Sequence, residues 1–269
     1  MKISFLGGGN MANALVGGLR AKGMAAGDLS VIEVNPAARE RIAAHGVGVS
    51  TAPDAATSGA EVLVLAVKPQ DMKRALASVA GSAGGKLVVS IAAGIRVEAL
   101  SRWLGGHHRM VRCMPNTPAL VGGGITALYA APRVDAQDRR RAEEILRAVG
   151  EVVWVEEERL LDPVTALSAS GPAYVFWLIE QLAAFGEAAG IAPADAQKLA
   201  LHTVLGAAEL AARSSEPPAV LRRNVTSKGG TTEAALNVFE QERLAEGFRK
   251  ALEAASRRGA AMGDEMGKD

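Results

Sequence analysis

The sequence is poor in features that several classes of protein depend on. It contains one cysteine among 269 residues, so no disulfide can form within the chain, which is usual in a reducing compartment. Aromatic residues make up 4%, too few for a surface on which nucleic-acid bases stack. The formal net charge is +1, from 30 basic and 29 acidic side chains, which gives no attraction to polyanions. We therefore expect a cytoplasmic protein with no nucleic-acid partner and no membrane partner.

Long hydrophobic runs are missing as well. No secretory leader is visible, and the most apolar segment, residues 173–191, is interrupted by Glu180, Gln181 and Glu187. This segment predicts a buried helix of a soluble protein. Cys113 lies in the apolar run MVRCM and is expected to be a buried, inert thiol. Because no closely spaced cluster of His, Cys, Asp and Glu occurs, we predict no metal site.

The first half contains a regular alternation of short apolar runs and helical segments. Strands are predicted at residues 3–6, 29–35, 62–67, 87–91, 110–113, 125–129 and 152–155, and helices at 10–21, 37–45, 69–77, 96–104 and 136–149. Strands that are apolar throughout and separated by helices indicate a parallel sheet covered on both faces. The expected fold class is α/β, with an N-terminal Rossmann-type doubly wound sheet.

The pattern changes near residue 155. No convincing strand follows, and helices are predicted at residues 172–189, 193–213, 231–240 and 246–262. We therefore predict two domains, an α/β domain over residues 1–155 and an all-α domain over residues 156–269. The helix at 172–189 is apolar on nearly every face, so we expect a second subunit to bury it. The polar tail, residues 263–269, is expected to fray.

A glycine-rich turn follows the first strand. Gly7, Gly9 and Ala12 satisfy the pattern G-x-G-x-x-A, in which glycines permit a tight turn and a close approach of pyrophosphate to the backbone. The free N–H groups of the following helix face the anion. A purely structural turn is the alternative. The position between a strand and a helix, at the head of a repeated βαβ pattern, favours dinucleotide binding.

The end of the second predicted strand bears on the choice of dinucleotide. NAD sites usually place an Asp or Glu there to bind the ribose hydroxyls, whereas this strand is predicted to end at Asn35. A neutral Asn leaves room for the extra phosphate of NADP, and Arg39 lies one helical turn later. NADPH is therefore favoured. NADH stays possible, because a small error in the strand end would make Glu33 the ribose ligand.

Polar and glycine-rich segments recur later in the chain. Residues 66–70, 90–94 and 114–118 each follow a predicted strand, at the sheet edge where α/β proteins bind ligands. In the helical half, the segment TSKGGTT at residues 226–232 puts a Gly-Gly turn before a helix. The N–H groups at Gly230, Thr231 and Thr232 suit a small carboxylate, and the hydroxyl of Ser227 adds a donor. Ordinary helix capping is the alternative interpretation.

Six segments together resemble one enzyme family. GGGNMA, AVKPQ, SIAAG, RCMPNTPA, SASGPAYVF and TSKGGTT, in this order, are similar to the corresponding segments of pyrroline-5-carboxylate reductases, and the resemblance covers essentially the whole chain. The resemblance implies a Rossmann domain, a helical domain that dimerises, and dimers that often assemble into decamers. It also implies hydride transfer from NADPH, sometimes NADH, to the cyclic imine 1-pyrroline-5-carboxylate, which yields L-proline.

The resemblance also implies roles for individual residues. The cofactor would be bound by Gly7, Gly8, Gly9, Asn10, Met11, Asn35, Ala66, Val67, Lys68 and Pro69, with Met114, Asn116 and Thr117 near the nicotinamide. The substrate would be bound by Ser227, Gly230, Thr231 and Thr232. Two positions depart from the family pattern, Ala169 in SASGP and Lys228 in SKGG, and we expect Lys228 to point to solvent.

The chemistry of an imine fits these segments, since none contains a His, Asp or Glu. Reduction of a ketone needs a strong proton donor, whereas an imine is protonated in solution and hydride addition neutralises it. The protein then needs only to position the ring and to let a hydroxyl bond its nitrogen, and Thr232 is the expected catalytic hydroxyl. Two alternatives are a 3-hydroxyacid dehydrogenase, which would use a lysine such as Lys228, and a non-enzymatic NADP-sensing protein.

Overall fold

The computed structural model describes residues 1–268, and the chain divides into two compact units. The first unit comprises Met1–Ser170 together with the residues from Ala254 onward, and the second comprises Gly171–Glu253. This division differs from the predicted one at residue 155 in two respects. The short helices that follow residue 157 and the last part of the C-terminal helix both group with the sheet.

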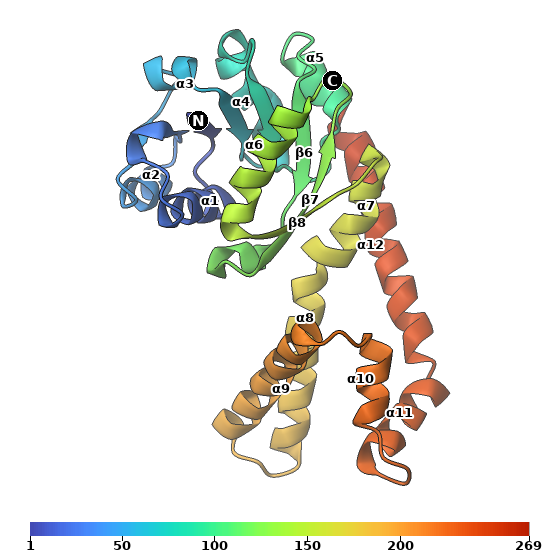
Figure 1. Ribbon diagram of the computed structural model, residues 1–269. Coiled ribbons are helices and arrows are strands. Elements are labelled where there is room, and N and C mark those ends of the chain that lie inside the picture. The colour runs from blue at the N-terminus through green and yellow to red at the C-terminus, as the bar shows by residue number, and fades with distance from the viewer. Residues whose placement is uncertain (269) are drawn as a thin grey trace. The chain divides into compact units, whose positions relative to one another are not determined.

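Within the described residues, the first unit contains an eight-stranded sheet with the order β3-β2-β1-β4-β5-β6-β7-β8 (Figure 1). Its strands are β1 (Ile3–Leu6), β2 (Leu29–Ile32), β3 (Gly48–Ser50), β4 (Val62–Leu65), β5 (Leu87–Ser90), β6 (Met110–Met114), β7 (Gly124–Ala130) and β8 (Gly150–Trp154). Neighbouring strands pair in parallel except for β6 and β7, which are antiparallel. The expectation of a parallel sheet is wrong at this pair, because the connection between them is too short for a helical crossover.

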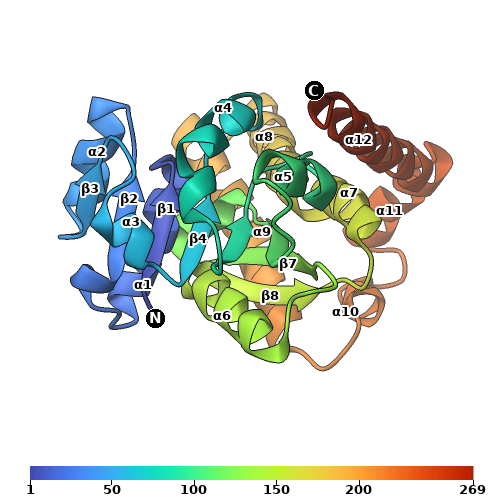
Figure 2. The same ribbon diagram turned by 90° about the horizontal axis from the view of Figure 1, so that it is seen from above.

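Helices cover both faces of this sheet, as Figure 2 shows. They are α1 (Asn10–Ala21), α2 (Pro36–Ala43), α3 (Ala55–Gly59), α4 (Pro69–Val79), α5 (Val97–Trp103), α6 (Ala136–Leu146) and α7 (Leu161–Val164). Alternation along β1 assigns the faces, since Phe5 packs in one hydrophobic cluster with α1 and α6 and Leu6 in another with α4 and α5. The predicted doubly wound Rossmann-type arrangement is confirmed.

Several boundaries differ from the predicted ones. The strand β2 ends at Ile32, three residues before the predicted end at Asn35. The edge strand β3 was not predicted, because it is short and only partly buried. The tail was expected to fray, and this is wrong up to residue 267. There the helix α12 (Leu244–Met266) continues, Arg96 pairs with Asp264 at 3.1 Å, and Arg102 donates to the Gly267 carbonyl at 2.6 Å.

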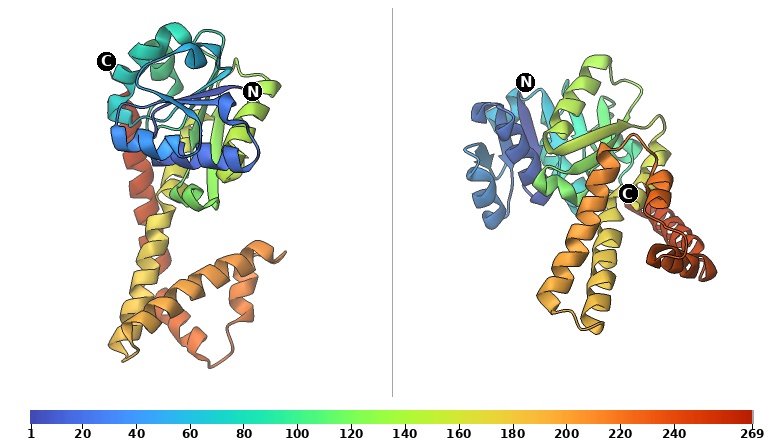
Figure 3. Two further views of the ribbon diagram at one scale, coloured as in Figure 1. Left: turned by 90° about the vertical axis from the view of Figure 1, so that its left-hand side faces the viewer. Right: turned by 60° about the horizontal axis from the view of Figure 1, so that its bottom comes forward.

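Over its described residues, the second unit consists of helices and the loops that join them. It consists of α8 (Gly171–Ala188), α9 (Pro193–Arg213), α10 (Pro218–Asn224), α11 (Thr231–Gln241) and the first part of α12. The helices α8 and α9 lie side by side, joined by a short turn (Figure 3). A Cβ at Gly186 would lie 3.0 Å from the Cβ of Ala196, so a glycine lets the two helices approach closely. Tyr174 meets Phe248 edge to face, with ring centroids 6.0 Å apart.

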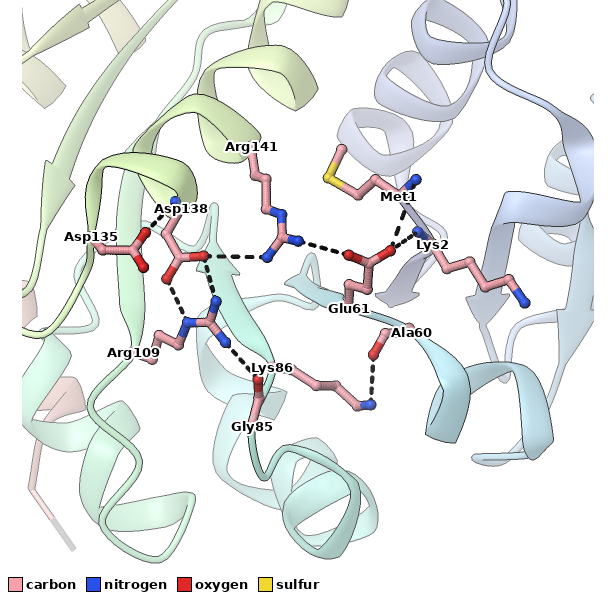
Figure 4. A network of polar contacts seen from close by, with 10 residues as sticks. All are labelled: Met1, Lys2, Ala60, Glu61, Gly85, Lys86, Arg109, Asp135, Asp138 and Arg141. Carbon is pink, nitrogen blue, oxygen red and sulfur yellow. Dashed lines mark hydrogen bonds and ion pairs between the residues drawn. The ribbon is translucent and has the colours of Figure 1, made fainter.

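A network of charged groups ties together the amino ends of four strands, β1, β4, β5 and β6 (Figure 4). Asp138, at the start of α6, is completely buried and accepts from Arg109 at 2.7 Å. Arg141 lies 3.6 Å from Asp138 and donates to Glu61 at 2.8 Å. Glu61 also accepts the backbone N–H of Lys2 at 3.1 Å. Because a buried carboxylate is costly without partners, Asp138 depends on both arginines.

We expect Asp138→Asn to lower the free energy of unfolding by about 2–3 kcal/mol, because the amide cannot accept from both arginines. The measurement is chemical denaturation of the purified chain. Glu151→Gln is the matched control, since Glu151 pairs with Arg147 on the surface at 3.0 Å and should contribute under about 1 kcal/mol. Equal losses in the two variants would contradict a special role for the buried carboxylate.

Candidate functional site

The glycine-rich turn lies where three strands of the first unit end. Gly7 follows β1 with φ of +102°, a conformation that favours glycine. Its N–H donates to the carbonyl of Ile32 at the end of β2, at 2.8 Å. A Cβ at Gly7 would lie 2.7 Å from the carbonyl oxygen of Ala66, just after β4. The turn therefore occupies the point between β1 and β4 where the strand order reverses, which is where open α/β sheets bind ligands.

The helix α1 begins beside this turn without a side-chain cap. Gly9 is its N-cap residue, and no side chain accepts from the first N–H groups, those of Asn10 and Met11 among them. A Cβ at Gly9 would meet nothing within 4 Å, so the space above the turn is open. This open space in front of uncapped N–H groups fits the pyrophosphate of a dinucleotide.

The segment after β4 joins the glycine turn, as the sequence predicts. Ala66 donates its N–H to the Leu6 carbonyl at 2.8 Å, which places it beside the end of β1. The side chain of Val67 would lie 2.8 Å from a Cβ at Gly7. Lys68 is exposed as the N-cap residue of α4, and Pro69 takes the first helical position. These four residues therefore line the same sheet edge as the glycines.

The turn after β2 contains the residues that bear on cofactor choice. Because β2 ends at Ile32, Glu33 directly follows the strand and Asn35 does not stand at its tip. The Asn35 side chain caps α2 by accepting from Ala38 at 3.0 Å, and Arg39 donates to the Val34 carbonyl at 3.1 Å.

The N–H of Gly8 also has a partner in this turn. Glu33 accepts it at 2.6 Å. Gly8 was predicted to bind the cofactor. Its N–H is bonded to a side chain, however, and does not face an open site.

The segment after β6 is held mainly by Asn116, which is buried. Its side-chain oxygen accepts from the N–H of Ile125 at 2.9 Å, and its side-chain nitrogen donates to the carbonyl of Ser168 at 3.3 Å. Thr117 begins the short helix η3 (Thr117–Val121), and Met114 is the last residue of β6. Asn116 therefore links the loop expected near the nicotinamide to β7 and to the SASGP segment.

A buried arginine near this segment was missed at the level of sequence. Arg112 is 2% exposed and pairs with Glu158 at 3.0 Å, and Glu158 also accepts the N–H of Val97 at 2.7 Å. The charge of Arg112 within the apolar run MVRCM was a sign that such a partner exists. The neighbouring Cys113 is buried as expected, and burial raises the pKa of its thiol, which makes it unreactive.

The predicted carboxylate site lies in the second unit. Gly229 has φ of +71°, Gly230 donates its N–H to the Ser227 carbonyl at 3.0 Å, and Gly230 then serves as N-cap residue of α11. No side chain caps the helix, so the N–H groups of Thr231 and Thr232 stay available to an anion. A Cβ at Gly230 would lie 2.4 Å from the Ser227 hydroxyl oxygen, so a side chain there would displace this hydroxyl.

An acidic residue next to this loop was also missed. Glu233 follows TSKGGTT directly and accepts the N–H of Gly229 at 2.7 Å. Glutamate in the first turn of a helix, four residues after a glycine turn, was the available sign. Lys228 is exposed, as expected. The carboxylate loop belongs to the second unit, whereas the strand ends around the glycine turn belong to the first.

Over residues 1–268, no group of three or more His, Cys, Asp and Glu side chains is arranged to hold a metal ion. Among the helices of that same range, none has the length and apolar character needed to cross a membrane.

Comparison with known proteins gives consistent matches along the chain. Residues 158–262 match the family model described as pyrroline-5-carboxylate reductase dimerisation, and residues 2–94 match the model described as NADP oxidoreductase, coenzyme F420-dependent. A pyrroline-5-carboxylate reductase of Pseudomonas aeruginosa is 42% identical over 269 residues, which cover 99% of this chain and 98% of that protein.

Solved structures agree with these matches. The pyrroline-5-carboxylate reductase of Coxiella burnetii is 39% identical, covers 97% of this chain and 98% of its own, and superposes with a TM-score of 0.92. The Plasmodium falciparum pyrroline carboxylate reductase with NADP bound is 27% identical, with 98% of each chain covered and a TM-score of 0.85.

Two glycine variants separate folding from dinucleotide binding. We expect Gly9→Val to lower the melting temperature by only a few degrees, since a Cβ there meets nothing within 4 Å and only the preference for glycine as N-cap residue is lost. The same variant should weaken dinucleotide binding at least about tenfold by blocking the pyrophosphate. Gly7→Val is the contrasting variant and should lower the melting temperature, because it combines a positive φ with a clash at Ala66. Binding is measured by fluorescence titration with NADPH, and unimpaired binding by Gly9→Val would exclude this placement of the pyrophosphate.

Proposed function

The chain belongs to the pyrroline-5-carboxylate reductase family, and from this premise we propose that it reduces 1-pyrroline-5-carboxylate to L-proline with NADPH as hydride donor and with NADH as a possible substitute. The structural observation that carries the proposal is a pair of uncapped helix N-termini, each preceded by a glycine turn. One, at α1, fits a pyrophosphate, and the other, at α11, fits a small carboxylate.

The residues present fit the cofactor. The N–H groups of Asn10 and Met11 would hold the pyrophosphate over the open face of Gly9, and Ala66–Pro69 would line the adjoining edge. When bound, the nicotinamide supplies the hydride. Met114 and Thr117, at the end of β6 and the start of η3, are proposed to lie beside it. Asn116 acts by fixing this loop through its two hydrogen bonds.

The α11 loop is proposed to position the substrate. The N–H groups of Thr231 and Thr232 would bind the carboxylate, together with the Ser227 hydroxyl beside Gly230. The imine nitrogen carries its proton from solution, so hydride addition at the neighbouring carbon leaves a neutral amine. The protein's share of the reaction is orientation of the ring, with the Thr232 hydroxyl hydrogen-bonded to the ring nitrogen.

Two alternatives are less well supported. A 3-hydroxyacid dehydrogenase would need a lysine as acid or base, and Lys228 is an exposed residue of a glycine turn and does not lie on a helix face. An NADP-sensing protein without catalysis would have no need of the carboxylate loop between Ser227 and Thr232.

Self-association is the second part of the proposal. Residues 158–262 match a dimerisation model, and α8 exposes large apolar side chains, with Trp177 57% and Phe185 75% exposed. An apolar groove of about 1280 Å³ lies between α8, α10, α11 and α12, lined by Trp177, Phe239 and Phe248 among others. Because so much exposed apolar surface is costly in water, we propose that a second copy covers it, and that dimers are the building block of any larger assembly such as a decamer.

The activity is tested by following NADPH oxidation with and without 1-pyrroline-5-carboxylate and identifying the product as proline. Oxidation that needs the imine and yields proline is expected.

Thr232→Ala should lower kcat by about 10- to 100-fold with little change in NADPH affinity, because one hydrogen bond to the reacting ring is lost. Thr232→Ser is the control and should retain most of the activity. An unchanged kcat in Thr232→Ala would remove the threonine from the chemistry.

Dimer formation is tested by sedimentation velocity. We expect the unaltered chain to sediment as a dimer or a larger even assembly and Trp177→Glu to shift it toward monomer, because a charge would be buried in an apolar interface. Val153→Glu, which places the same charge on an exposed residue of β8, should leave the assembly intact. A monomer from the unaltered chain at micromolar concentration would contradict this proposal.

A further inference from the structure

Glu33 joins two backbone segments at the glycine turn. It directly follows β2, and its two carboxylate oxygens accept different N–H groups, that of Gly8 at 2.6 Å and that of Asn35 at 2.7 Å. A Cβ at Gly8 would lie 3.2 Å from both Cβ and Cγ of Glu33, so the side chain lies flat against the turn. The carboxylate is therefore held at the end of β2, next to the glycines.

This is the position from which Rossmann domains distinguish their cofactors. An acidic side chain at the end of the second strand accepts hydrogen bonds from the adenosine ribose hydroxyls of NAD, and a cation in its neighbourhood accommodates the 2′-phosphate of NADP. A carboxylate offers about four acceptor sites, so the bonds from Gly8 and Asn35 leave capacity for a ribose hydroxyl. The negative charge repels a phosphate at the same place.

The two residues of this turn that favour NADP, Asn35 and Arg39, both form hydrogen bonds within the protein. Asn35 directs its side-chain oxygen to the N–H of Ala38 as the cap of α2. Arg39, the cation expected to meet a 2′-phosphate, donates to the carbonyl of Val34 at 3.1 Å. A fixed anion, Glu33, and a tethered cation, Arg39, thus lie on either side of Asn35 in the sequence.

We propose that Glu33 sets the preference between NADPH and NADH. Its carboxylate accepts a ribose hydroxyl of NADH and holds down the affinity for NADPH, while Arg39 acts in the opposite direction. Because it concerns the cofactor of the reductase, the assignment rests on the proposed function.

The test is titration of the purified full-length chain with NADPH and with NADH, without imine, followed by nicotinamide fluorescence. In Glu33→Gln the charge is lost while one backbone N–H can still be bonded. We expect the ratio of the two Kd values to move toward NADPH by about 10- to 100-fold, as loss of one repulsive charge near a phosphate requires. Glu40→Gln, an equal charge change at an exposed residue of α2, should leave the ratio within about twofold.

A second variant keeps the test decisive if Glu33→Gln folds poorly. Arg39→Ala leaves both Glu33 hydrogen bonds in place and should move the ratio toward NADH by about tenfold. Equal changes of both Kd values in Glu33→Gln would reduce Glu33 to a support for the turn, and an unchanged ratio in both variants would overturn the proposal. Since no imine is present, a chain that selects cofactors as expected and yet makes no proline would refute only the proposed function.

Discussion

The first half of the site depends on a close backbone contact between Gly7 and Ala66. The turn after β1 and the turn after β4 meet so closely that a Cβ at Gly7 would lie 2.7 Å from the Ala66 carbonyl oxygen. This contact turns the chain sharply into α1 and leaves the helix N-terminus open at the point where the strand order reverses. A side chain at Gly7 would separate the turns and tilt the helix away from the site.

The two edges of the sheet differ in whether their polar groups have partners within the protein. At the amino edge, Asp138, Arg109, Arg141 and Glu61 are bonded to one another, so charges that would be costly alone stabilise the sheet together. At the carboxyl edge, backbone N–H groups at the start of α1 are left without side-chain partners. The charged network thus lies at the edge opposite the proposed dinucleotide site, and it leaves the N–H groups of α1 without side-chain partners.

The second unit differs from the first in how much apolar surface it leaves exposed. Its helices bury little within one chain, and Phe185 and Trp177 are largely exposed. At the same time, α11 starts with a glycine turn at positive φ and an uncapped N-terminus, the same arrangement that is proposed to bind a larger anion at α1. These exposed apolar faces are the surface that the proposed second copy would cover.

The sequence by itself determined the alternation of strands and helices, the two glycine turns and the family, because these depend on local periodicity and on φ values that only glycine adopts easily. Helices 10–21 and 193–213 were predicted to the residue, since proline, glycine and polar residues mark their ends. The tertiary structure alone decided the antiparallel pairing of β6 and β7, the end of β2 and the partners of Arg112 and Glu33. Each of these depends on which distant backbone or charge lies opposite a residue, and that is a property of packing that no local pattern contains.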